Sequence, residues 1–170
     1  MRRYIYLAVL VATALALSIL EMSLPLPFIA PGAKLGLSNM VILVTLILFG
    51  FKEGFIVAVL KSLVLMLVAG SVSSMLYSMA GSVLSVVVMW FTYRYFSNIF
   101  SLIGVSILGA SAHNFAQITV AALITENIKM YSYLPVLIIV GLFTGYFVGI
   151  SSKYISNHLR RLDFQNMRRS

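Results

Sequence analysis

The stretch YIYLAVLVATALALSIL at residues 4–20 contains no charged side chain, and it indicates what kind of protein this is. Lipid offers no hydrogen-bonding partner to a bare backbone, so an apolar stretch that crosses a bilayer must form a helix. A hydrocarbon core of about 30 Å needs about 20 residues of helix to cross it. The stretch therefore predicts a transmembrane helix near the N-terminus.

Five further apolar runs follow, and most charged residues lie at the seams between them. Turns are expected at residues 50–54, at the serines that follow Gly70, and at Asn98, and Pro135 suits the first turn of the last span. The fold class is therefore all-α: a polytopic membrane protein with a bundle of six transmembrane helices. Residues 1–170 form a single integral membrane domain with spans at 4–20, 35–49, 55–69, 74–93, 100–124 and 134–155 and a basic tail at 156–170.

Composition excludes several other classes of protein. Of the 170 residues, 61% are hydrophobic and 9% are charged, which leaves too little polar surface for a soluble globule. The net charge of +8 comes from basic residues beside the predicted spans, unlike a nucleic-acid-binding stripe with interleaved aromatics. The chain has no cysteine, which excludes disulfides, thiolate metal sites and cysteine nucleophiles.

The basic residues also predict the orientation of the chain. With the N-terminus in the cytoplasm, most of the 12 lysines and arginines lie inside, and only Lys34 and Lys129 lie outside. The positive-inside rule then assigns both termini (N-in/C-in) to the cytoplasmic side of the cell membrane in a multi-pass arrangement. The run at 4–20 resembles a signal peptide, but its length and the proline-bearing loop after it favour a retained helix.

Lys61 is expected near the middle of the third span. It follows Lys52 by about 13 Å of helix at 1.5 Å per residue. A lysine at the bilayer centre costs about 2.5 to 3.5 kcal/mol on insertion scales, which makes it a candidate functional residue. In the alternative interpretation its butyl chain snorkels to the cytoplasmic interface, and the sequence leaves both open.

His113, Asn114 and Gln117, which we call the His113 group, bring an imidazole and two amides into the fifth span. His113 and Gln117 share a helix face because they are four residues apart. The group is expected to line a polar pocket, and the alternative is hydrogen bonding between helices, typically about 0.6 kcal/mol per contact. With 2 histidines and a single aspartate in the chain, we expect no metal site and no other cofactor.

The stretch PGAKLGLSN at residues 31–39 lies where an outer loop enters the second span. Its Lys34, Ser38 and Asn39, together with the backbone amides of the helix start, suit an anion. The alternative is an ordinary loop whose lysine reaches lipid phosphates. The outer mouth of the bundle therefore favours an anionic or polar ligand.

Ala8, Ala12 and Ala16 form a stripe of small residues along one face of the first span, here called the alanine stripe. Small residues at this spacing allow another helix to approach closely. The stripe predicts either a partner interface or close packing within the chain.

Two stretches carry a resemblance to a known family: PGAKLGLSN at 31–39 and GASAHNFAQ at 109–117. They resemble heptaprenyl diphosphate synthase component I, a family also called Gx transporters, and the resemblance covers essentially the whole chain. That family is similar to the S components of energy-coupling factor (ECF) importers, which have six helices and capture substrate from outside. The resemblance implies a substrate-binding subunit for a small anionic, isoprenoid-like or vitamin-like ligand.

The resemblance also implies partners and site residues. In S components a motif of spaced alanines on helix one docks the transmembrane T subunit, which acts with ATPase subunits, and the alanine stripe matches that motif. Lys34 would lie in the loop that caps the ligand. The candidate substrate-binding residues are Lys34, Ser38, Asn39, Lys61, His113, Asn114 and Gln117.

The chain is not expected to be an enzyme. Prenyl diphosphate synthases hold magnesium through paired aspartate-rich motifs, whereas this chain has only Asp163, in the predicted tail. It also lacks a phosphate-binding Gly-xxxx-Gly-Lys-Ser/Thr motif, so ATP hydrolysis would come from partners. One alternative is a non-catalytic accessory subunit of heptaprenyl diphosphate synthesis. Another is an ion-coupled carrier in which Lys61 and His113 titrate.

Overall fold

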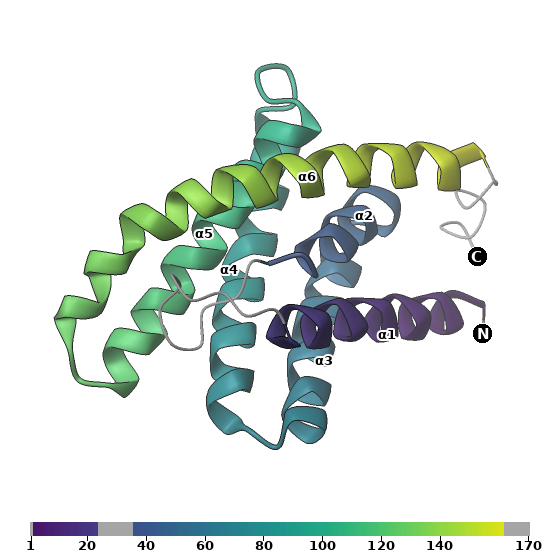
Figure 1. The fold of residues 1–170 in the computed structure, drawn as a ribbon. Helices are drawn as coiled ribbons and strands as arrows, with labels where there is room; N and C mark the ends of the chain where they lie inside the picture. The colour runs from purple at the N-terminus through teal and green to yellow at the C-terminus, as the bar shows by residue number, and fades with distance from the viewer. Residues whose placement is uncertain (1, 24–35, 162–170) are drawn as a thin grey trace.

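The computed structural model describes residues 2–23 and 36–161 (Figure 1). Within these residues the fold is all-α, as predicted, with no strand. The α-helices are α1 (Arg2–Ser23), α2 (Asn39–Phe49), α3 (Phe51–Ala69), α4 (Val72–Tyr95), α5 (Leu102–Ile124) and α6 (Leu134–Arg161), and the 3₁₀ helix η1 (Ile128–Tyr133) precedes α6.

Among the described residues, four helices are long and apolar enough to cross a membrane. They cover Tyr4–Ser23, Val72–Tyr95, Leu102–Ile124 and Ile128–Leu159. The apolar α2 has 11 residues, about half of what a bilayer crossing needs. The 19 residues of α3 include Lys52, Glu53 and Lys61. Each predicted span thus corresponds to a helix, while six crossings and the orientation stay predictions.

The turn predicted at residues 50–54 is wrong. Because α3 begins at Phe51, Gly50 alone separates α2 from α3. Its φ of 101° lies in the region that favours glycine, and its N–H donates to the Leu46 carbonyl at 3.1 Å. A single glycine therefore connects the two helices and turns the chain between them.

The other predicted turns agree with the structure in whole or in part. The loop after Gly70 is short, because α4 begins at Val72 and Ser71 caps it by accepting a hydrogen bond from the Ser74 N–H at 3.2 Å. The serines expected in this loop therefore lie partly inside the helix. Asn98 lies in a turn and Pro135 in the first turn of α6, so both of these predictions are confirmed.

α2 contacts all five of the other α-helices, and its residues from Val41 to Phe49 are all buried. In Figure 1, α1 runs across α3, and α6 extends along α5. The most extensive helix contacts are those of α5 with α6 and of α4 with α5. One apolar core combines residues of five helices, among them Leu7, Ile42, Val57, Val86 and Val105. Polar side chains that enter this interior are enclosed by protein.

Three glycines on α6 allow it to approach α5 closely. Gly141, Gly145 and Gly149 repeat every four residues and are buried. A Cβ atom on Gly145 would lie 2.7 Å from the Cα of Ile107, and one on Gly149 would lie 2.6 Å from the Cα of Ile103. Both neighbours are backbone atoms, which cannot rotate away. The two helices can therefore approach this closely only because the residues of α6 at these positions have no side chain.

A Gly149→Ala variant is expected to destabilise the α5–α6 pair. The added methyl group meets backbone that cannot rotate away, and overpacking of this kind costs about 1 to 3 kcal/mol. Thermal unfolding in detergent measures the effect. Gly104→Ala is the matched control, because its Cβ would meet only the Phe100 side chain, at 3.0 Å. Equal unfolding temperatures for the two variants would contradict the backbone contact.

Candidate functional site

Polar side chains from five helices and from the segment before α2 meet in the interior. Each is at most 4% exposed, although the surrounding core is apolar. Burying polar groups without partners is costly, so a group of this size requires internal bonding or a ligand. The members, which we call the polar cluster, are Glu21, Ser38, Asn39, Lys61, Ser62, Ser78 and His113.

Lys61 and Glu21 both bond to the segment that leads into α2. The Lys61 ammonium donates to the Ser38 hydroxyl, and the Leu37 N–H donates to Glu21 Oε1. An ammonium group on α3 and a carboxylate on α1 thus bind two consecutive residues, Ser38 and Leu37. Because the Lys61 side chain is 1% exposed, the snorkelling interpretation is wrong.

Ser62 and Ser78 extend the polar cluster from α3 to α4. Their hydroxyl oxygens lie 3.0 Å apart, and Ser62 also bonds the Ala58 carbonyl at 2.9 Å. Since a hydroxyl has one proton, Ser62 donates to Ala58 and accepts from Ser78. This link sets the α3 and α4 sides of the site at a fixed spacing.

His113 lies between two glycines. A Cβ atom on Gly81 of α4 would lie 2.6 Å from Cε1 of the ring, and one on Gly36 would lie 3.4 Å from Cδ2. Gly36 has φ +81°, which L side chains rarely adopt. The imidazole, 2% exposed, therefore occupies space that only glycine leaves open on α4 and before α2.

Asn39 offers the site a donor and an acceptor. Its side chain is 3% exposed, and neither Nδ2 nor Oδ1 has a hydrogen-bond partner within the described part of the chain. The same Nδ2 would lie 2.9 Å from a Cβ on Gly36, so the amide lies beside that residue and near His113. An amide that is buried with both groups unsatisfied suits a polar ligand.

The structure divides the predicted His113 group. Asn114 points toward α6, where its Nδ2 donates to the Leu137 carbonyl at 2.6 Å and would lie 2.9 Å from a Cβ on Gly141. For the Asn114 Nδ2 the alternative of hydrogen bonding between helices holds. Its Oδ1 is buried without a hydrogen-bond partner in the described part of the chain, so the assignment of Asn114 to a pocket stays a prediction. Gln117 is 1% exposed and shares the helix face of His113, as expected. The physical reason for the division is the rotation of about 100° per residue, which turns neighbouring side chains to different partners.

The remaining predicted residues are placed as follows. Lys34 lies outside the described residues. The alanine stripe faces outward, because Ala8, Ala12 and Ala16 are all exposed. The buried face of α1 instead carries Ala14 and Glu21. The stripe is therefore available to a partner, and the alternative of close packing within the chain does not hold for the described residues.

Sequence reasoning missed two parts of the site. Glu21 was expected in the loop after the first span, but α1 continues to Ser23 and buries its carboxylate. Gly81 lies in the middle of α4, and a glycine inside a helical run is itself a signal of close packing. In the described part of the chain, no group of three or more His, Asp or Glu side chains is arranged to hold a metal ion.

A Gly81→Ala variant is expected to displace the His113 ring. The methyl group would lie within 3.0 Å of three ring atoms, which costs about 1 to 3 kcal/mol of overpacking. Thermal unfolding of Gly81→Ala, His113→Ala and the double variant forms a double-mutant cycle. We expect the double variant to be more stable than the sum of the single effects indicates. Strict additivity of the two stability losses would contradict the contact between Gly81 and His113. Gly54→Ala is the control, because the nearest atom to its added Cβ would lie 3.3 Å away.

Comparison with known proteins gives the family. No curated protein and no solved structure matches the chain. The family model of heptaprenyl diphosphate synthase component I matches residues 10–155, which include the polar cluster and most of the alanine stripe. This match spans well over half of the chain, and it agrees with the resemblance carried by residues 31–39 and 109–117. The chain therefore belongs to the heptaprenyl diphosphate synthase component I family.

Proposed function

We propose that this protein is the substrate-binding S component of an ECF-type importer. The observation that carries the proposal is the polar cluster: an ammonium, an imidazole and an unsatisfied amide enclosed in an apolar bundle. Ionisable groups inside a membrane protein are costly and by default mark a functional site. The chain binds its ligand and carries out no covalent chemistry.

The chemistry of the polar cluster favours a small anionic or polar ligand. Lys61 of α3 supplies a positive charge, and hydrogen-bonding groups come from Ser38 and Asn39 at the start of α2 and from His113 of α5. In a site of low dielectric, such donors bind an anion more strongly than they do in water. Lys34, outside the described residues, and Gln117, beside His113 on α5, are proposed as further contacts.

The ligand enters from the outer face, and the partner binds along α1. The segment with Gly36 and Ser38 follows the loop between α1 and α2, which the positive-inside rule assigns to the outside of the cytoplasmic membrane. The outward alanine stripe suits a T subunit, which would connect this chain to ATPase subunits. Transport then follows from docking and not from an activity of this chain alone.

A second candidate function is favoured by the family description. Heptaprenyl diphosphate synthase component I denotes a subunit of an isoprenoid synthase. In this candidate the chain is a non-catalytic membrane accessory that binds a soluble prenyltransferase. The exposed alanine stripe would then receive that enzyme in place of a T subunit.

Purification in mild detergent from the native membrane tests both candidates. Mass spectrometry identifies the proteins and the small molecules that the tagged chain retains. A T subunit with ATPases, together with a retained small anion, is the result expected for the importer. A prenyltransferase without ATPases would overturn the importer and support the accessory subunit.

A further inference from the structure

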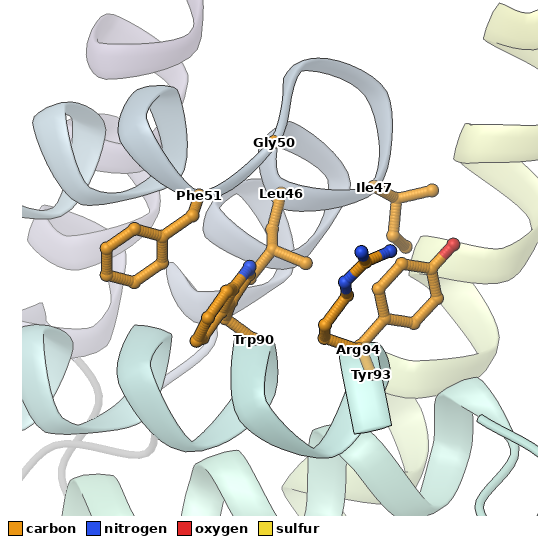
Figure 2. Close-up of a pocket in the computed structure, with 7 residues that line it drawn as sticks. All are labelled: Leu46, Ile47, Gly50, Phe51, Trp90, Tyr93 and Arg94. Carbon is orange, nitrogen blue, oxygen red and sulfur yellow. The ribbon is translucent and has the colours of Figure 1, made fainter. Parts of the chain in front are cut away.

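A second site lies far from the polar cluster, at the other end of α4. Ser78 of the polar cluster and Arg94 lie about 24 Å apart along the helix axis at 1.5 Å per residue. Here the turn between α2 and α3 and the end of α4 enclose a cavity of about 460 Å³ (Figure 2). This volume is within the range of about 300 to 1,000 Å³ that is typical of small-molecule sites. The cavity is lined by Leu46, Ile47, Gly50, Phe51, Trp90, Tyr93 and Arg94.

The side chains that line this cavity are apolar or aromatic except Arg94, and polar atoms make up about half of its lining surface. Leu46 and Ile47 of α2 are buried. The rings of Phe51 and Trp90 lie with their centroids 5.0 Å apart and their planes inclined by 48°, so they form a packed aromatic pair. The pair joins the start of α3 to α4 and bounds one side of the cavity. Such walls suit the apolar part of an amphiphilic ligand.

Arg94 brings a positive charge to these walls. In Figure 2 its side chain extends from α4 toward Ile47 of α2 and lies between Trp90 and Tyr93. The Arg94 side chain forms no hydrogen bond or ion pair with any residue that the structure describes. A basic residue in the last turn of a helix also complements the helix dipole, but that role does not require a cavity beside it. A guanidinium whose donors are unused suits phosphate, which it can bind through two parallel hydrogen bonds.

The position of the cavity along the chain agrees with a membrane interface. Trp90, Tyr93 and Tyr95 lie together at the end of α4, and tryptophan and tyrosine gather at the head-group level of bilayers. Lys52 and Arg94 are also predicted to lie on the cytoplasmic side. In that leaflet anionic lipids are common, and basic pockets between helices bind their head groups.

We propose that this cavity binds the phosphate head group of an anionic amphiphile, with Arg94 at the phosphate and the aromatic walls against its apolar part. The ligand comes either from the lipid of the cytoplasmic leaflet or from a soluble phosphate compound, because the recognised chemistry is the same. The site is separate from the polar cluster and does not depend on the proposed importer function.

Trp90 provides a direct readout, because it is the only tryptophan in the chain and it lines the cavity. The full-length protein is placed in nanodiscs of phosphatidylcholine that contain increasing fractions of brominated phosphatidylglycerol. Bromine quenches tryptophan fluorescence on close approach. Brominated phosphatidylcholine serves as the reference lipid. Inorganic diphosphate, added to nanodiscs of phosphatidylcholine alone, tests the soluble source.

Arg94→Gln is the test variant. Arg94 is exposed and has no partner among the described residues, so its loss should leave the fold intact. Lys153→Gln is the matched control, because it removes one positive charge from an exposed position of α6 and none from the cavity. Both variants are compared with the wild type by size-exclusion chromatography before the titration.

In the wild type, we expect brominated phosphatidylglycerol to quench Trp90 at about one tenth of the lipid fraction that brominated phosphatidylcholine requires. A tenfold preference is what one charge-assisted hydrogen bond to the head group would give. Arg94→Gln should lose this preference and Lys153→Gln should keep it. A response to inorganic diphosphate that depends on Arg94, without a lipid preference, would also support the site and identify a soluble source. The proposal is overturned if neither probe acts on Trp90, or if Arg94→Gln responds as the wild type does.

Discussion

A Lys61→Met variant is expected to lose ligand capture while keeping its fold. Methionine has a similar length and no charge, so it fills the same space in α3. Removing one partner of a buried, hydrogen-bonded charge pair costs about 2 to 5 kcal/mol, which corresponds to at least about 30-fold weaker binding of an anion. A lysine at the bilayer centre costs about 2.5 to 3.5 kcal/mol on insertion scales. The substitution removes this cost, which offsets the lost hydrogen bond, so the fold should survive.

The measurement is the amount of small molecule that copurifies with the variant, together with its unfolding temperature in detergent. Lys52→Met is the matched control, since Lys52 lies on the same helix and is exposed. The control should retain as much ligand as the wild type. A Lys61→Met protein that retains the ligand fully would remove Lys61 from the site. A collapse of stability without ligand present would instead make Lys61 a structural residue.

The helices could be predicted from the sequence because apolar runs leave the backbone no other choice in lipid. The run at 100–124 became α5 at Leu102–Ile124, and the run at 134–155 became most of α6. The ends were harder to predict. Gly50 alone turns the chain between α2 and α3, because its φ of 101° is open to glycine. Composition does not reveal a turn of one residue.

The site could be predicted only in part. Lys61 stood out because a charge in an apolar run is conspicuous, and its burial agrees with that signal. The direction of Asn114 was harder to predict. The sequence gives the spacing of side chains along a helix but not which neighbouring helix each face meets. The Asn114 side chain donates a hydrogen bond to Leu137 of α6. The contact of Gly81 with His113 joins α4 to α5 and required the packed structure.

An Ala12→Leu variant is expected to lose its protein partner while keeping its ligand. Ala12 is the middle residue of the alanine stripe and is exposed on α1, so leucine there meets no residue of the chain's interior. A helix that packs on small residues approaches too closely to admit a larger side chain. Overpacking at such a contact costs about 1 to 3 kcal/mol, which weakens docking by about 5- to 150-fold.

Partner recovery and ligand retention, measured on the same purified sample, separate docking from folding. Ala12→Ser is the control, because serine keeps the surface small and should dock as alanine does. If Ala12→Leu recovers the partner as well as Ala12→Ser does, α1 does not dock through this stripe. Loss of both partner and ligand would mean that the variant misfolds, and Ala16→Leu, one turn further along the same exposed face, would then repeat the test. Because Lys61 lies inside the bundle and Ala12 on its surface, the two substitutions should affect capture and docking separately. That separation is what the division of an importer into a capturing subunit and an energised partner requires.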